Sequence, residues 1–252
     1  MEIERETMEQ RTKDPLVIAR GGASAEAPEH TIAAFEAALA EGADALALCV
    51  RLTRDGHPVA FGPPTLERTT DGRGPVGERT VRELKRLDAG GWKGPRWGGQ
   101  RVQTLQEVLE RFRDRTRIWI ELPDGADAQA GIEERVIATL EIYEVVERCL
   151  VHSADPAALD RVRAFNPDVP LGARWSAGPL ASVLPAPGRA EAVCPAAEVL
   201  READLEQIRA AGLSCHVWTI NEPVLADRLI GWRVDGIFTD RPGLVRARIG
   251  RT

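Results

Sequence analysis

Short apolar runs of strand length alternate with longer amphipathic segments along almost the whole of this 252-residue chain. Residues 16–19 (LVIA) and 45–52 (ALALCVRL) are such apolar runs, and residues 32–42 (IAAFEAALAEG) between them read as a helix that opens after Thr31 and ends at Gly42. A parallel strand needs a long crossover, usually a helix, before the next parallel strand can begin. The alternation therefore predicts repeated βα units and an α/β fold.

A closed (β/α)8 barrel is the commonest way to arrange such units in about 250 residues. An open doubly wound sheet is the alternative, but no GxGxxG motif opens the first helix. We expect a polar tail over residues 1–14 and a single barrel domain over residues 15–252. Nine strand runs can be counted, at residues 16–19, 45–52, 57–61, 117–122, 149–154, 171–176, 190–195, 215–221 and 235–240.

One of these runs is surplus to an eight-stranded barrel. The candidates are residues 57–61 (HPVAF) and 190–195 (AEAVCP), which would then lie outside the closed sheet. Residues 57–61 follow the run 45–52 after only four turn residues, Thr53 to Gly56, and so short a link cannot carry a parallel crossover. We therefore expect a hairpin or a local irregularity there.

Composition narrows the class of protein. A content of 43% hydrophobic and 29% charged residues is ordinary for a globular chain with a sizeable core. The net charge is -6 and the arginines are interleaved with acids, so neither a nucleic acid nor a membrane surface is indicated as a partner. No apolar run reaches membrane-spanning length, and the first fourteen residues are too charged for a signal peptide. We expect a cytoplasmic protein acting on a small molecule; the sequence leaves the oligomeric state open.

The four cysteines, Cys49, Cys149, Cys194 and Cys215, are far apart and form no CxxC pair. Each lies in an apolar run, which predicts buried free thiols in a reducing compartment and not a disulfide framework or a zinc knuckle.

Residues 43–70, which read ADALALCVRLTRDGHPVAFGPPTLERTT, resemble the glycerophosphodiester phosphodiesterase family. The likeness continues in IARGGASAEAPEHTIAAFEAAL, TLQEVLERF, VWTIN and VDGIFTDRP, so it covers the chain nearly from end to end. It implies a (β/α)8 barrel of the PLC-like phosphodiesterase type. It also implies a hydrolase in which carboxylates hold a divalent cation over a phosphodiester and two histidines act as acid and base.

This chain departs from the family pattern at the residues that carry that chemistry. The family's H-R-G stands here as Arg20-Gly21-Gly22, and its E-x-K keeps Glu121 but replaces the lysine. A single carboxylate cannot hold a hard cation such as Mg²⁺ or Ca²⁺. We expect the metal site and the family hydrolysis to be lost. The remaining departures are Ala47 and Cys49 for the Glu and Asp ligands, Gly62 and Pro63 for the second His-Asp pair, and Pro123 for the lysine.

The replacements are concentrated at the mouth of the barrel, whereas the Gly, Pro and apolar pattern of the barrel is undisturbed. New polar groups also occur on inward strand registers, at His152 and Arg174, and Ala154 stands where the family has an aromatic residue. The pattern indicates a pocket rebuilt for another task by divergence or by engineering, and we favour engineering.

One hypothesis for the rebuilt pocket is metal-free catalysis by Cys49, His152 and Glu121. Strand alternation places Glu121 and His152 on adjacent inward positions, where the carboxylate could fix the imidazole tautomer while Cys49 acts as nucleophile in acyl transfer or ester hydrolysis. The alternatives are that Cys49 is a small buried filler and His152 a hydrogen-bonded strand histidine. A soft-metal site on the same three residues is a further possibility.

A second hypothesis makes Glu121 or His152 a general base that abstracts a proton from a flat apolar substrate stacked on Trp119 or Trp218. Loss of the neighbouring charges would raise the pKa of Glu121 there. The alternative from another functional class is a pseudoenzyme, a non-catalytic barrel that binds a ligand or a partner through Arg20 and Arg174. A residual metal-dependent phosphodiesterase is the last alternative.

We expect no cofactor. The predicted substrate-binding residues are Arg20, Trp119, Ala154, Arg174 and Trp218. No lysine lies at a predicted strand end, which argues against Schiff-base chemistry. His30 replaces an Asn of the family and is either a polar contact or a helix-start residue. Asn221 and Asp240 are predicted to be structural, and His57 and His216 to be surface or packing residues.

Overall fold

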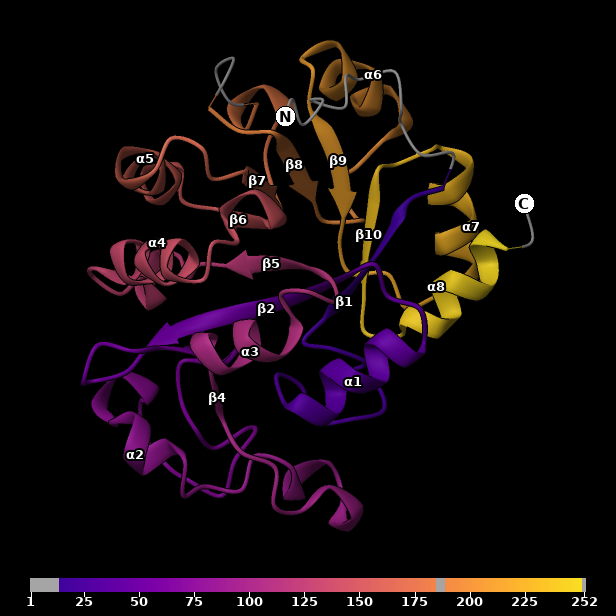
Figure 1. Ribbon diagram of the computed structural model, residues 1–252. Helices are drawn as coiled ribbons and strands as arrows, with labels where there is room; N and C mark the ends of the chain where they lie inside the picture. Colours follow the sequence, from indigo (N-terminus) through magenta and orange to yellow (C-terminus); the bar gives the residue numbers. More distant parts are fainter. Residues whose placement is uncertain (1–13, 185–188, 251–252) are drawn as a thin grey trace.

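The computed structural model describes residues 14–184 and 189–250, so residues 1–13 of the predicted tail lie outside the described residues. Eight parallel strands close into a barrel, because β1 (Leu16–Arg20) pairs with both β2 (Ala45–Leu52) and β10 (Gly236–Thr239). Helices surround the barrel (Figure 1). The predicted (β/α)8 fold is confirmed. The other barrel strands are β5 (Arg117–Glu121), β6 (Cys149–Ser153), β7 (Leu171–Trp175), β8 (Ala192–Pro195) and β9 (Ser214–Val217).

The surplus strand is the run HPVAF. Its residues form β3 (Pro58–Ala60), which pairs antiparallel with β2 as the expected hairpin, whereas residues 190–195 supply the barrel strand β8. A two-residue strand, β4 (Gln103–Thr104), pairs with β3 and extends this antiparallel ribbon away from the barrel.

The helices begin where the sequence offers caps. Thr31 caps α1 by accepting a hydrogen bond from the Ala34 amide, and Thr104 forms a capping box with Glu107 at the start of α3. The helix predicted over residues 101–114 is shorter, at residues 105–112, because Gln103 and Thr104 belong to β4. The last helix, α8, was not predicted. The helices are α1 (Ile32–Ala40), α2 (Val81–Leu84), α3 (Leu105–Phe112), α4 (Ile132–Ile142), α5 (Pro156–Phe165), α6 (Glu202–Ala210), α7 (Pro223–Gly231) and α8 (Pro242–Ile249).

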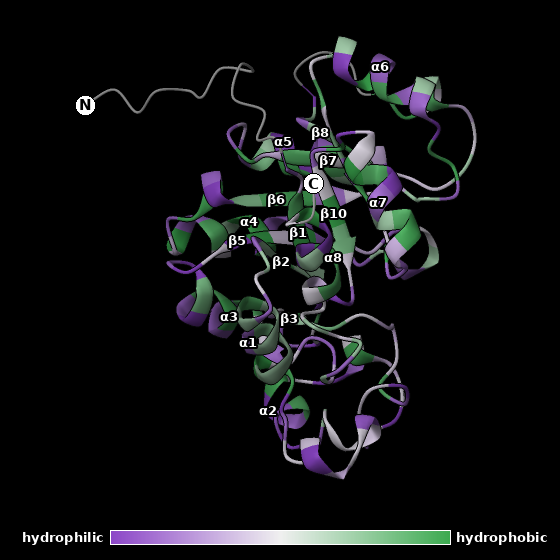
Figure 2. Ribbon diagram, turned by 90° about the vertical axis from the view of Figure 1, so that its right-hand side faces the viewer, coloured by the Kyte–Doolittle hydropathy of each residue, from purple (hydrophilic) through white to green (hydrophobic). Residues whose placement is uncertain are grey.

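The segment between β3 and β4, residues 61–102, forms a lobe beside the barrel (Figure 2). It contains α2 and short 3-10 turns and has an apolar cluster of its own, which includes Phe61, Leu66, Val76 and Leu84. Many of its outer residues are hydrophilic (Figure 2). The lobe is therefore a small packed unit that can present side chains to the barrel.

Strand alternation sets which side chains reach the barrel interior. In β2, Ala45 and Ala47 belong to the interior cluster, whereas Leu46 and Leu48 pack with the surrounding helices. The next residue in the inward series is Cys49, at the carboxyl end of the strand. The same alternation in β5 puts Trp119 inside the barrel and Glu121 at its end.

All four cysteines are free. Cys149, Cys194 and Cys215 are buried as predicted, whereas Cys49, at the barrel mouth, is only partly buried. Among the described residues, no helix is both long enough and apolar enough to cross a lipid bilayer.

Candidate functional site at the barrel mouth

The carboxyl ends of five barrel strands bring the predicted residues together. In the strand register Cys49 is opposite Glu121, and Glu121 is opposite His152. Arg20 and Arg174 arrive from β1 and β7 and line the same narrow cavity as these three residues. A larger cavity of about 750 Å³ lies at the mouth and shares Arg20, Cys49 and Glu121 with the narrow one.

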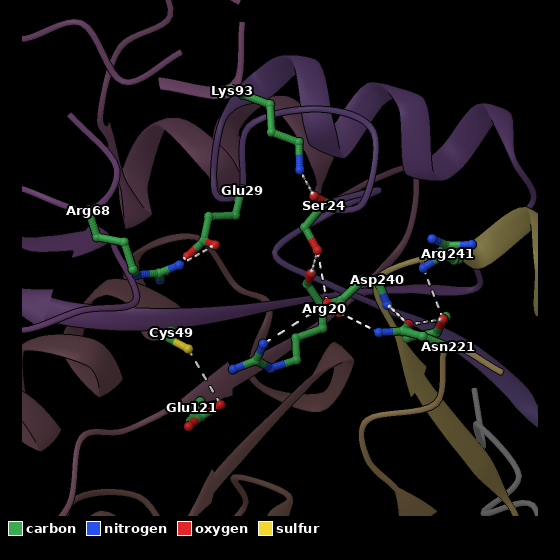
Figure 3. A network of polar contacts seen from close by, with 11 residues as sticks. Arg20, Ser24, Glu29, Cys49, Arg68, Lys93, Glu121, Asn221, Asp240 and Arg241 are labelled. Carbon is green, nitrogen blue, oxygen red and sulfur yellow. Dashed lines mark hydrogen bonds and ion pairs between the residues drawn. The ribbon is translucent and has the colours of Figure 1, made fainter. Parts of the chain in front are cut away.

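Glu121 forms two polar contacts that occupy both of its carboxylate oxygens. One oxygen forms an ion pair with Arg174, and the other accepts a hydrogen bond from the Cys49 thiol at 3.4 Å (Figure 3). Four-fifths of each side chain in the ion pair is buried, since 17% of Arg174 and 20% of Glu121 is exposed. Such a buried pair is screened far less than a surface salt bridge.

The predicted rise in the pKa of Glu121 is wrong. Burial acts to raise the pKa of this carboxyl, but the charges and the hydrogen bond that face it, above all the guanidinium of Arg174, together outweigh burial and hold the pKa below its usual value. The sequence placed Arg20 and Arg174 at the pocket, but it did not show that their guanidiniums face the Glu121 carboxylate. Glu121 is ionised and ion-paired, which makes it a weak base.

Cys49 is not arranged as a nucleophile. Burial raises the pKa of its thiol well above the ordinary value, and the charge of Glu121 raises the pKa further. The thiol donates its hydrogen bond to Glu121, so no base in contact with it accepts the proton in the way a catalytic imidazole would.

His152 is buried, with 3% of its surface exposed, and burial lowers its pKa from 6.5 to about 4. Neither ring nitrogen has a hydrogen-bond partner, so the predicted hydrogen bond from His152 to Glu121 is not formed. The ring packs against Phe238 at a centroid separation of 5.5 Å. His152 is therefore a neutral imidazole without a protein partner on either nitrogen, and the residue lines a cavity of only about 10 Å³.

The predicted substrate-binding residues divide into two groups. Trp218 lies under the guanidinium of Arg174, with 4.5 Å between the Arg174 Cζ atom and the ring, and its indole nitrogen donates to the Cys194 carbonyl at 2.8 Å. Trp119 lies deeper in the barrel, where its indole donates to His216 Nδ1 at 3.3 Å. Trp218 therefore borders the site, while Trp119 belongs to the interior packing.

Arg20 is the more accessible of the two arginines, with 46% of its side chain exposed. Its nearest acid is Asp240, at 4.0 Å. Ala154 lies just beyond β6, where it lines a separate cavity of about 250 Å³ with Ser153 and Arg174. Arg174 thus borders two cavities.

The rim of the mouth is held by a polar network around Asp240 (Figure 3). Asn221 donates to one carboxylate oxygen of Asp240 at 2.7 Å, and the Ser24 hydroxyl donates to the other at 2.9 Å. Asn221 also accepts from the Asp240 amide at 2.9 Å, so the two residues link β10 to the loop after β9. These contacts agree with the structural role predicted for both residues.

The lobe contributes residues that the sequence did not reveal as part of the mouth. Lys93 donates to the Ser24 carbonyl at 2.6 Å, and Arg68 forms a two-pronged ion pair with Glu29 (Figure 3). Arg68 lies within the family-like segment PTLERTT, which was the available signal, but nothing in that segment shows that the lobe folds over the mouth. His30, next to Glu29, is buried there with a positive φ of 60°.

The side chains present do not fit the divalent cation that the family resemblance implies. No cluster of three or more His, Cys, Asp or Glu residues suited to a metal ion occurs within residues 14–184 and 189–250. Glu121, the carboxylate retained from the family pattern, is paired with Arg174, and Asp240 is engaged by Asn221 and Ser24. A hard cation needs several oxygen ligands, and two guanidiniums beside Glu121 repel it. The soft-metal alternative fails because Cys49, His152 and Glu121 do not form such a cluster in the described residues: the Cys49 thiol donates to Glu121, which is itself paired with Arg174.

Comparisons with known proteins agree with the geometry of the fold. A model of the glycerophosphoryl diester phosphodiesterase family matches residues 21–244. A glycerophosphodiester phosphodiesterase of Bacillus subtilis is 32% identical over 91% of this chain and 84% of its own length. The corresponding enzyme of Caldanaerobacter subterraneus is 36% identical over 90% of this chain and 94% of its own length.

Solved structures show the same relationship. An Oleispira antarctica phosphodiesterase, solved with the product sn-glycerol-3-phosphate, has a TM-score of 0.82 and 30% identity, with 94% of this chain and 97% of that chain covered. A glycerophosphodiester phosphodiesterase from Agrobacterium tumefaciens has a TM-score of 0.80 and 28% identity, with 92% and 99% covered. The family is one of hydrolases that act on small-molecule substrates. With this barrel, this mouth and these relatives, the chain belongs to the glycerophosphoryl diester phosphodiesterase family.

Proposed function

We propose that this chain is a family member that binds a small phosphate-bearing molecule at the barrel mouth and does not hydrolyse it by the metal-dependent route. The observation that carries the proposal is the ion pair between Glu121 and Arg174. It places a guanidinium against the one carboxylate that the family pattern retains, and so removes that carboxylate from metal binding.

The states of the three candidate catalytic groups support binding over metal-free catalysis. The Cys49 thiol is protonated, Glu121 is an ion-paired carboxylate, and His152 is neutral with no partner on either nitrogen. A nucleophile needs a base within hydrogen-bonding reach, and a general base needs a pKa near the working pH. None of the three groups meets these requirements, so metal-free acyl transfer and proton abstraction are the less well supported readings.

Two observations favour a phosphate-bearing ligand: the positive charges at the barrel mouth and the ligand of a solved relative. Arg20 and Lys93 both line the larger cavity, and Lys93 contacts a backbone carbonyl there in place of an acid. The Oleispira antarctica relative was solved with sn-glycerol-3-phosphate, a molecule of the class proposed here. Arginine and lysine are the side chains that bind phosphate most often.

The test is a turnover assay paired with a binding assay. Glycerophosphocholine is incubated with the protein in Mg²⁺ or Ca²⁺ and again with EDTA, and an activated aryl ester is tested in parallel. The Bacillus subtilis relative serves as the positive control. We expect no metal-stimulated diester cleavage and no ester cleavage above background, together with saturable binding of sn-glycerol 3-phosphate by calorimetry. Metal-stimulated cleavage that EDTA abolishes would refute the proposal.

A further inference from the structure

We propose that the lobe, residues 61–102, docks on an anionic lipid bilayer. This inference goes beyond the proposed function, and either can fail without the other. The lobe contains nine of the 33 arginine and lysine residues of the chain but only five of its 39 aspartate and glutamate residues, which leaves 24 cationic and 34 anionic residues elsewhere. The protein is therefore a basic lobe on an acidic body, a division that the net charge of -6 conceals.

Most cations of the lobe are not neutralised by a neighbouring acid. Two of the nine form ion pairs, Arg68 with Glu29 (Figure 3) and Lys85 with Glu107. In the part of the chain that the structure describes, the other seven form no ion pair, and four of them donate to backbone carbonyls, which carry no net charge. The seven are Arg73, Arg79, Arg82, Arg86, Lys93, Arg96 and Arg101.

Acids of the lobe hold its turns together and so are kept from these arginines. Glu67 accepts a hydrogen bond from the Gly74 amide at 2.7 Å. Asp88 accepts from the amides of Gly90 and Gly99, at 2.8 and 3.1 Å. A carboxylate that is tied to backbone amides cannot turn to meet a guanidinium. The excess positive charge is therefore built into the fold of the lobe and is available to an anionic surface.

Two tryptophans accompany this charge in the loop before β4. Trp92 is one of the few large apolar side chains that are exposed, at 39%. Its indole nitrogen donates to the Ala89 carbonyl at 3.0 Å, so the rest of the ring is free to leave water. Trp97 lies under the guanidinium of Arg96, whose Cζ atom is 4.8 Å from the ring. Tryptophan favours the interface between water and lipid, where arginine keeps its charge at the phosphates.

The shape of this loop favours a bilayer over a nucleic acid. Single-stranded nucleic acids bind in a positively charged groove that follows their backbone. Arg96 and Trp97 instead lie on a short 3-10 turn, Pro95–Trp97, and the space beside Gly94 and Gly99 is open. An exposed turn that carries tryptophan and arginine can enter a flat lipid interface without enclosing its partner.

The docking surface also borders the barrel mouth. Trp92 and Lys93 line the larger cavity there, and Lys93 ties the loop to the Ser24 carbonyl (Figure 3). Arg96 makes a second tie, to the Glu26 carbonyl at 3.4 Å. A bilayer bound by this loop therefore lies beside the mouth.

The first test is sedimentation of the full chain with lipid vesicles. One set is pure phosphatidylcholine, and the other contains about one-third phosphatidylglycerol. We expect binding to the anionic set at about 0.01 M salt and its loss at about 1 M, where the Debye length falls from about 30 to about 3 Å. The inference fails if neither set binds or if both bind equally. It also fails if a single-stranded oligonucleotide binds while anionic vesicles do not.

Arg96→Gln removes one cation from the docking turn, and we expect the partition coefficient on anionic vesicles to fall about fivefold. Arg228→Gln is the matched control, because Arg228 is also exposed and lies over a tryptophan, Trp232 at 5.2 Å, but on α7 of the barrel. Arg96→Lys keeps the charge and should bind within about twofold of the wild type, which a misfolded lobe could not do. Equal binding by Arg96→Gln and Arg228→Gln would overturn the inference.

Trp92→Ala tests the apolar contribution separately. We expect the partition coefficient to fall about tenfold, because the exposed part of the ring no longer enters the lipid interface. Trp232→Ala, the matched change on the barrel, should leave the partition coefficient unchanged. A Trp92→Ala variant that binds as tightly as Trp232→Ala would contradict insertion of the loop.

Discussion

We expect acid to unfold this protein at a higher pH than its carboxyl groups alone would require, because three of its histidines are buried and neutral. Burial lowers the pKa values of His30, His152 and His216 from 6.5 to about 4 in each case. In the unfolded chain the same residues take up protons near pH 6.5. Between these values the unfolded state binds more protons, so stability is complete above pH 6.5 and is lost as the pH falls towards 4.

The size of the effect follows from the two pKa values. At pH 5 the proton uptake of the unfolded chain lowers the free energy of unfolding by about 2 kcal/mol per histidine. The three histidines together contribute about 6 kcal/mol, which is comparable to the whole stability of many domains. Carboxyl groups whose pKa is lowered, such as Glu36 at about 2, lose their contribution only below about pH 4.5, so the window from pH 6.5 to 4.5 reports the histidines.

Urea unfolding followed by tryptophan fluorescence at pH 7.5 and at pH 5 measures how much the free energy of unfolding falls between the two pH values. His152→Phe removes one of the three titrations without breaking a hydrogen bond, since both nitrogens of His152 lack partners. The fall in the free energy of unfolding from pH 7.5 to pH 5 should therefore be about 2 kcal/mol smaller in this variant than in the wild type. His57→Asn, at an exposed position, is the matched control. An equal loss in His152→Phe and the wild type would refute the reasoning.

Three further predictions concern the mouth and the backbone near it. The double substitution Ala47→Glu and Cys49→Asp restores the family ligands, so that three carboxylates, Glu121 included, face one point. We expect weak binding of Ca²⁺ or Mg²⁺, detected by calorimetry. Cation binding no stronger than that of the wild type would show that Arg174 still blocks the site. In the native protein, Cys49 should react with iodoacetamide at pH 7.5 at least about tenfold more slowly than an exposed cysteine, because burial raises the pKa of its thiol. Rapid alkylation of Cys49, measured by mass spectrometry, would contradict this prediction. Gly22→Ala should lower the free energy of unfolding by about 2–4 kcal/mol, because φ is +86° and a Cβ would lie 2.5 Å from the Ala34 backbone. Gly212→Ala, with φ of +76° and open space, should lose only about 1 kcal/mol in the same urea assay, and equal losses would rule out the steric contribution.

Much of the fold could be read from the chain because it depends on local patterns. The alternation of apolar runs and helices predicted the barrel, and the four-residue turn after residues 45–52 predicted the hairpin that became β3. Strand alternation also placed Cys49, Glu121 and His152 on the inner face at the mouth. A residue's direction in a strand follows from its position alone, which is why these placements needed no tertiary information.

The chemical states of the same residues depend on neighbours that are distant in the chain. Arg174 is 53 residues from Glu121 and two barrel strands away, yet its guanidinium is the strongest of the charges that lower the pKa of Glu121. The Cys49 thiol likewise donates to this carboxylate, 72 residues away in the chain, and not to an imidazole. Lys93 likewise reaches the mouth from a lobe whose packing no strand pattern reveals. Position in a strand determines which way a side chain points, whereas its charge state depends on burial and on the charges that face it, which only the folded barrel brings together.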